Sequence, residues 1–205
     1  MIARRSVLAA VAALTALGMR TGNASAANPD AAKAFVKSLA DEAIALMAQR
    51  NTTSPAQQAR FRELFTRGFD VEEIGRFVLG RYWREATDTE RAEYLKLFED
   101  LIVSTYASRF SEYSGEKLTV LDARADDDRT VIVVSQIERP GGQPAIRLDW
   151  RLVENGSRFR ITDVVIEAVS MSVAQRSEFA SVIQRGGGRV ESLLAALRAK
   201  TRTMR

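Results

Sequence analysis

The apolar pattern of the chain changes its period once, near Gly115, and this change constrains the fold more than any other feature of the sequence. Before Gly115, apolar residues recur at the three- and four-residue spacing of an amphipathic helix. After it, they alternate with polar residues in residues 117–125, 129–138, 144–154 and 157–169, and the turn-forming stretches DDD, RPGGQ and ENG separate these segments. The alternation predicts four successive strands in an antiparallel meander, so we expect an α+β fold.

Helix-capping residues divide the part of the chain before this sheet into four helices. A cap residue followed by a helical pattern occurs at Asn28, Ser54, Asp70 and Thr87, and the fourth pattern continues to about Tyr113. Apolar side chains of this fourth segment recur on one face, which predicts a long amphipathic helix.

The segment after the last strand, residues 166–188, is rich in serine and glycine and raises the question of an active site or a phosphate cradle. Ser172 followed by Gln175 has the spacing of a capping box, and the glycines at 186–188 end a helix before a last helical pattern over 189–200. No general base accompanies the serines, and no Lys-Ser/Thr pair follows the glycines. The pattern therefore favours a strand-to-helix junction over a catalytic site.

Two strands show which way the sheet faces and where it bends. In the third, Leu148 and Trp150 belong to an apolar series that alternates with charged residues, so one face is buried and the other is exposed. In the fourth, the apolar residues before Asp163 are out of phase with Val164 and Ile166. This change of phase predicts a β-bulge near Asp163 that bends the sheet.

The first residues have the composition of a secretory signal peptide. Arg4 and Arg5 precede a short apolar run, and the small residues Ala24-Ser25-Ala26 form a cleavage site. We expect a signal peptide over residues 1–26, a single domain over residues 27–205, and export to the periplasm. Removal of this segment takes away three arginines and no acidic residue, which leaves a net charge close to zero and no basic surplus that predicts nucleic-acid binding.

The absence of histidine and cysteine excludes several kinds of chemistry. Without them there is no Ser-His-Asp or Cys-His catalysis, no disulfide, and no thiolate metal site. We expect no metal and no cofactor. An enzyme that uses carboxylates is still open, because a cavity between helices and a bent sheet can hold an aspartate as a general base, and Asp163 is the candidate. The simpler interpretation is that Asp163 bonds nearby backbone amides at the bulge.

A protein-binding or structural module is a further alternative. The aromatic residues of the chain can all belong to an ordinary core, or they can face a ligand in a cavity between the helices and the sheet. The residues concerned are Phe77, Tyr82, Trp83, Phe98, Tyr106 and Trp150.

Two stretches resemble the phospholipid-binding proteins of the Mla pathway, also called the toluene-tolerance family. They are GRYWREATDTERAEYLKLFEDLIVSTYASRF and DVVIEAVSMSVAQRSEFASVIQRGGGRVESLLAAL, and the likeness extends from about Phe35 to Leu197. Where the family usually has glycine and an aromatic residue, this chain has Ala168 and Gln175. The positions that match the pattern of the second stretch are Asp163, Val164, Val169, Ser170, Arg176, Ser177 and Phe179.

The resemblance implies a lipid carrier without catalytic activity. Its fold would be a cone similar to nuclear transport factor 2, with N-terminal helices on a bent four-stranded sheet, C-terminal helices, and an apolar cavity for acyl chains. Its ligand would be a phospholipid, or a hopanoid-like lipid as in a neighbouring branch. Its partners would be an inner-membrane ABC transporter with a ring-forming substrate-capture subunit and an outer-membrane lipoprotein complex, and the carrier would be a monomer.

Strand alternation and helix periodicity supply the residues that we expect to contact the lipid. Leu148 and Trp150 should face the cavity from the sheet, with Ile102 and Tyr106 opposite them. The full set is Phe77, Tyr82, Trp83, Phe98, Leu101, Ile102, Tyr106, Ile132, Val134, Ile146, Leu148, Trp150, Val164 and Ile166.

Overall fold

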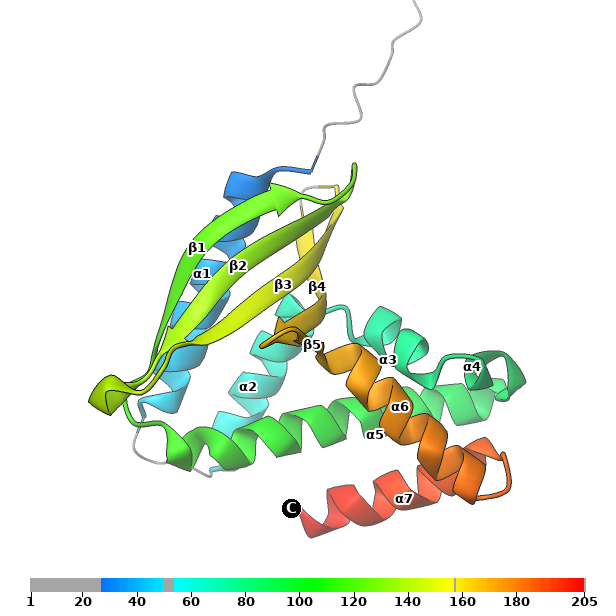
Figure 1. Cartoon of the computed structure of the whole chain (residues 1–205). Helices are drawn as coiled ribbons and strands as arrows, with labels where there is room; N and C mark the ends of the chain where they lie inside the picture. Colours follow the sequence, from blue (N-terminus) through cyan, green and yellow to red (C-terminus); the bar gives the residue numbers. More distant parts are fainter. Residues whose placement is uncertain (1–26, 50–53, 157, 205) are drawn as a thin grey trace, which may run out of the picture.

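The computed structural model describes residues 27–49, 54–156 and 158–204. The proposed signal peptide, residues 1–26, lies outside the described residues. The described chain forms seven α-helices and a five-stranded sheet (Figure 1). The helices are α1 (Pro29–Met47), α2 (Pro55–Gly68), α3 (Val71–Leu79), α4 (Tyr82–Glu85), α5 (Asp88–Ala107), α6 (Met171–Arg185) and α7 (Val190–Thr203). The strands are β1 (Lys117–Ala125), β2 (Thr130–Glu138), β3 (Ile146–Asn155), β4 (Arg158–Ile166) and β5 (Val169–Ser170).

The sheet is the antiparallel meander that the alternation predicts, with the strand order β1-β2-β3-β4-β5. The sequence suggested four strands, with the last one running to Val169. The chain instead reverses at Glu167 and Ala168, which both have positive φ angles (47° and 67°), and the two residues after this turn pair with β4 as the short strand β5. A two-residue turn with positive φ at both positions is typical of a tight β-hairpin.

The predicted bulge lies in β4. Arg151 pairs with Asp163, while the next residue of β3, Leu152, pairs with Ile161, so Thr162 is the extra residue. The insertion restores the phase of the strand, and apolar side chains on both sides of Thr162 therefore face the same side of the sheet.

The predicted helix caps are confirmed at α1, α2, α3 and α5. The side chains of Asn28, Ser54, Asp70 and Thr87 each accept a hydrogen bond from a backbone N–H in the first turn of the helix that follows. Helix α5 ends at Ala107, earlier than expected, and continues as a 3-10 helix over Ser108–Glu112. The short helix α4 was not predicted.

The prediction of Ser172 as the N-cap of α6 was wrong by two residues. Ser170, rather than Ser172, accepts the hydrogen bond from the backbone N–H of Val173. The capping-box spacing favoured Ser172, but its backbone N–H instead donates to the carboxylate of Asp163, nine residues earlier in the chain.

The helices and the sheet have separate hydrophobic cores. The inner face of the sheet packs on α1 and α2, whereas α3, α4, α5, α6 and α7 pack on one another. In Figure 1, α1 lies behind the sheet, and α5 and α7 lie beyond its lower end. Within the described ranges, no helix combines the length and apolar character that crossing a membrane requires.

Candidate functional site

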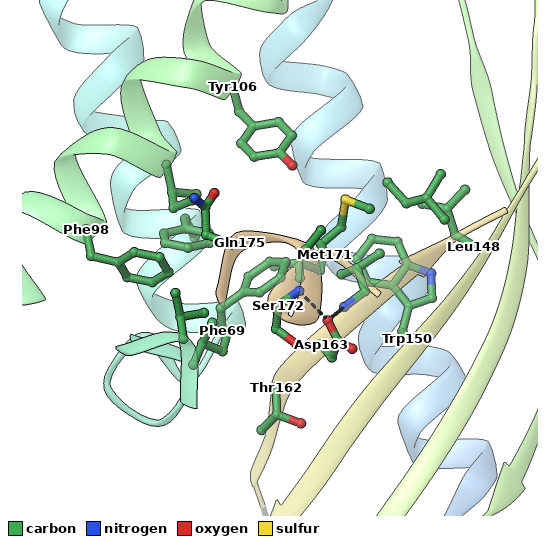
Figure 2. Close-up of a pocket in the computed structure, with 18 of the residues that line it drawn as sticks. Phe69, Phe98, Tyr106, Leu148, Trp150, Thr162, Asp163, Met171, Ser172 and Gln175 are labelled. Atoms are coloured by element: carbon green, nitrogen blue, oxygen red, sulfur yellow. Dashed lines mark hydrogen bonds between the residues drawn. The ribbon is translucent and has the colours of Figure 1, made fainter. Parts of the chain in front are cut away.

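An apolar cavity of about 430 Å³ lies between the inner face of the sheet and the helices (Figure 2). Its walls come from β3 and β4 on one side and from α1, α2, α3, α5 and the first turns of α6 on the others. The volume lies within the ~300–1,000 Å³ that is typical of sites for small ligands. The cavity is the feature of the molecule best suited to hold a ligand.

The register of β3 and β4 builds the sheet side of the cavity. Trp150 pairs with Val164, and Leu148 pairs with Ile166, so these four side chains share one face of the sheet. The bulge at Thr162 makes this arrangement possible, because without it Val164 and Ile166 would point to the opposite face from the earlier apolar residues of β4.

A hydrogen bond to a buried serine sets the position of Trp150. Its indole Nε1 donates to the hydroxyl of Ser135 at 2.8 Å, and this hydroxyl donates in turn to the carbonyl oxygen of Leu148 at 3.4 Å. Ser135 is fully buried. The polar edge of the indole is therefore satisfied within the sheet, and the ring contributes an apolar surface to the cavity.

Helix α5 faces the sheet across the cavity with Phe98, Ile102 and Tyr106, which are spaced four residues apart. Phe98 is buried against Phe179, while Tyr106 is 44% exposed. The cavity therefore runs from a buried region at Phe98 to the surface at Tyr106.

The polar groups of the cavity gather at the junction of β4, β5 and α6. The carboxylate of Asp163 accepts hydrogen bonds from the hydroxyl of Ser170 at 2.6 Å and from the backbone N–H groups of Val164 (2.9 Å) and Ser172 (3.1 Å). Figure 2 shows Asp163 beside Ser172 at the edge of the apolar lining. Asp163 thus has the structural role of bonding backbone amides at the bulge. Among the described residues, no cluster of carboxylates could hold a metal ion.

Comparison with known proteins identifies the family. Residues 37–199, most of the chain, match the family described as MlaC protein. The chain belongs to the MlaC protein family.

Named relatives of this MlaC-family chain include toluene tolerance protein ttg2D of Pseudomonas putida, which is 21% identical over 61% of this chain and 58% of its own length. The intermembrane phospholipid transport system binding protein MlaC of Haemophilus influenzae is 28% identical over 50% of this chain and 49% of its own length. The chain thus spans about half the length of the curated relatives it matches.

A solved structure shares the fold of this MlaC-family chain. It is that of a phospholipid-binding protein from Ralstonia solanacearum in complex with a phospholipid, with a TM-score of 0.69 and 23% sequence identity. The match covers 84% of this chain and 98% of the other.

Half of the residues that the sequence suggested for lipid contact line the cavity of this MlaC-family fold. They come from α5, β3 and β4, and they are Phe98, Ile102, Tyr106, Leu148, Trp150, Val164 and Ile166. Their contact with lipid stays a prediction.

The suggested aromatic residues near α3 and α4 lie outside the cavity. Tyr82 is buried in the helical core together with Leu101, and Trp83 packs against the same core. Phe77 is 40% exposed and lies beneath the guanidinium of Arg176. The sequence shows that these residues are apolar, but the side of the helix on which they lie depends on how α3, α5 and α6 pack together.

The remaining suggested residues belong to strands. Ile132 and Val134 pair with Arg151 and Asp149, so they lie on the outer face of the sheet. Strand β2 is apolar at successive positions, and its alternation therefore could not show which residues point inward. Ile146, the first residue of β3, is half-buried but lies outside the cavity lining.

Sequence reasoning missed the contribution of α1, α2 and α3. The sequence shows that these helices have apolar faces, but it does not show that small residues such as Ala40 and Ala43 leave space for a ligand. The lining residues that the sequence analysis missed in this part of the chain are Leu39, Ala40, Ala43, Phe61, Leu64, Phe65, Phe69, Ile74 and Val78.

Proposed function

We propose that this protein is a lipid carrier that holds the acyl chains of a phospholipid in the cavity. The observation that carries the proposal is the apolar cavity itself, which lies between two separately packed cores and reaches the surface at Tyr106. Membership of the MlaC family and the names of its relatives support phospholipid as the ligand. The head group would stay near the surface, next to Tyr106 and the exposed residues Ala174 and Glu178.

The energetics of lipid transfer explain why a carrier needs such a cavity. Burial of one methylene contributes ~0.8 kcal/mol, so exposing a chain of about fifteen methylenes to water costs on the order of 12 kcal/mol. An apolar cavity offsets this cost during transfer. Because a membrane stabilises the lipid similarly, the direction of transport must come from partners that favour one state of the carrier.

The proposed setting is the periplasm, after removal of residues 1–26 as a signal peptide. The carrier would be a monomer of one domain, residues 27–205. It would exchange lipid with an inner-membrane ABC transporter that has a ring-forming substrate-capture subunit, and with an outer-membrane lipoprotein complex. The carrier would perform no covalent chemistry, which agrees with the three donors already bonded to the carboxylate of Asp163.

Native mass spectrometry of protein purified from the periplasm tests the proposal. We expect a lipid-bound species that organic extraction removes, and analysis of the extract identifies it as a phospholipid or a hopanoid. A homogeneous lipid-free protein that also takes up no labelled phospholipid from vesicles would contradict the proposal and favour a protein-binding module.

A further inference from the structure

Phe69 separates the apolar cavity from a second, chemically different hollow. It lines the 430 Å³ cavity and also a hollow of about 450 Å³. The side chains around the second hollow are mainly polar and include Asp70, Glu72, Glu99 and Arg160. One aromatic residue thus stands between a space suited to hydrocarbon and a space lined by charged groups.

The backbone of Phe69 is fixed on both sides. Its N–H donates to the carbonyl oxygen of Phe65 at 2.8 Å, and the N–H of the next residue, Asp70, donates to the carbonyl oxygen of Ile161 in β4 at 2.9 Å. The guanidinium of Arg160 donates to the carbonyl oxygens of Thr66 and Phe69. Helix α2 and strand β4 therefore hold this residue at a defined place.

The ring of Phe69 is held by packing. Its centroid lies 4.8 Å from that of Phe65, which is buried and also lines the cavity. Figure 2 shows Tyr106 on one side of the cavity and Phe69, with Thr162, on the other. A ligand that enters beside the exposed Tyr106 would therefore meet the half-buried Phe69 on the far side of the cavity.

We propose that Phe69 is a specificity-determining residue that limits the length of the acyl chain this protein accepts. This inference rests on the proposed function as a lipid carrier. A chain that enters beside Tyr106 ends against the ring of Phe69, and further methylenes would have to displace the ring or enter the hollow with Glu72, Glu99 and Arg160. Hydrocarbon that lies among charged groups is not transferred to an apolar environment. Methylenes beyond Phe69 therefore add no further free energy of binding.

Two substitutions should move this limit in opposite directions. Wild-type protein, Phe69→Ala and Phe69→Trp are each incubated with a mixture of saturated phosphatidylglycerols of increasing chain length, and native mass spectrometry gives the occupancy of each species. Phe69→Ala should shift the preferred length upward, with up to about a fourfold gain in relative occupancy for each methylene newly buried. Phe69→Trp should shift it downward. If Phe69→Ala does not fold, Phe69→Leu replaces it, with a smaller upward shift expected.

Phe35→Ala is the matched control. Phe35 is a half-buried phenylalanine that packs against Phe159, 6.1 Å away between ring centroids, and it lies outside the cavity lining. Its loss should leave the chain-length profile unchanged. Phe69 variants that bind lipid with the wild-type profile would overturn the role of Phe69 alone, whereas a wild-type protein that binds none of the lipids would overturn the proposed function as well.

Discussion

At the scale of single residues, Ala168 adopts a backbone conformation that does not suit its side chain. Its φ angle is 67°, in the left-handed region, where a residue with a Cβ atom is disfavoured by roughly 1–2 kcal/mol. Its neighbour Glu167 shares this region, but its carboxylate accepts a hydrogen bond from the backbone N–H of Arg147 at 2.6 Å. The tight turn that joins β4 to β5 imposes this φ angle on Ala168.

Ala168→Gly should therefore stabilise the protein. We expect the free energy of unfolding to rise by about 1 kcal/mol, because glycine relieves the steric cost of a positive φ angle. Urea denaturation measures the change. Ala92→Gly, on an exposed position of α5, is the control and should lower stability by ~0.5–1 kcal/mol. A loss of stability in Ala168→Gly would show that the turn does not strain this residue.

Asp163→Asn tests whether the carboxylate is structural or catalytic. The amide has one acceptor oxygen in place of two, and its NH₂ group cannot accept from the three donors that now converge on the carboxylate. We expect the free energy of unfolding to fall by about 1–3 kcal/mol. Asp149→Asn, which weakens an ion pair with the exposed Arg147, should cost less than about 1 kcal/mol. Loss of turnover of an acyl or steroid-like substrate, with stability unchanged, would favour the enzyme alternative.

At the scale of helices and strands, the sequence predicts most of what local chemistry decides. Side chains that bond the first turn of their own helix, such as Asp70 and Thr87, are recognisable because cap and helix are adjacent in the chain. The choice of Ser170 over Ser172 as a cap was not predictable in this way, because it depends on Asp163 from a different element. The faces of β2 were ambiguous for a similar reason, since pairing with β3 decides them.

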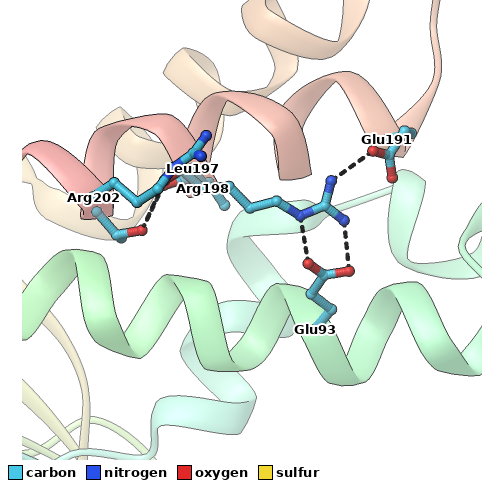
Figure 3. A network of polar contacts seen from close by, with 6 residues as sticks. Glu93, Glu191, Leu197, Arg198 and Arg202 are labelled. Atoms are coloured by element: carbon cyan, nitrogen blue, oxygen red, sulfur yellow. Dashed lines mark hydrogen bonds and ion pairs between the residues drawn. The ribbon is translucent and has the colours of Figure 1, made fainter.

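The packing of α7 on α5 also depends on a contact between distant parts of the chain (Figure 3). The guanidinium of Arg198 donates to both carboxylate oxygens of Glu93, at 2.6 and 2.7 Å, and to Glu191 at 2.7 Å. The hydrogen bonds from Arg198 lower the pKa of Glu93 below its ordinary value. The buried leucines of α7, including Leu193 and Leu194, hold the same two helices together.

The contribution of Glu93 to stability should depend on pH. Because its pKa is lower in the folded than in the unfolded protein, this contribution is complete above the unfolded value, ~4.3, and is lost as the pH falls through the folded value. Urea denaturation of wild type and Glu93→Gln over a pH series should therefore show a stability difference at neutral pH that shrinks in acid. The same comparison in an Arg198→Met background should show no such dependence. A stability difference between wild type and Glu93→Gln that stays the same in acid would contradict the stabilising role of the Glu93–Arg198 ion pair.

At the scale of the whole molecule, the cavity lies where the core of the sheet and the core of the helices do not fully meet. Trp150 packs at the edge of one core and Phe98 belongs to the other, and both line the space between them. Sequence patterns could predict which faces are apolar, and hence Leu148 and Tyr106 at the cavity. Sequence patterns could not show which apolar faces pack against another element and which line a cavity, because a packed core and a cavity wall require the same apolar residues.

Leu148→Glu distinguishes a packed core from a cavity that holds acyl chains. Leu148 is 5% exposed and lines the cavity from β3. In a packed core the new carboxylate would have no partner and would cost several kcal/mol, a large part of the ~5–15 kcal/mol that stabilises a typical domain. In a cavity, water can solvate the charge once the lipid is absent.

Lipid extraction from purified Leu148→Glu, together with its thermal melting followed by circular dichroism, tests whether the inner face of β3 lines a lipid cavity. We predict a protein that is exported and folded, melts cooperatively, and contains no bound phospholipid. Arg147→Glu, on the exposed outer face of the same strand, should keep the lipid content of the wild type. A Leu148→Glu protein that is unfolded, or one that is folded with its full load of lipid, would contradict the claim that this face of the sheet holds the acyl chains.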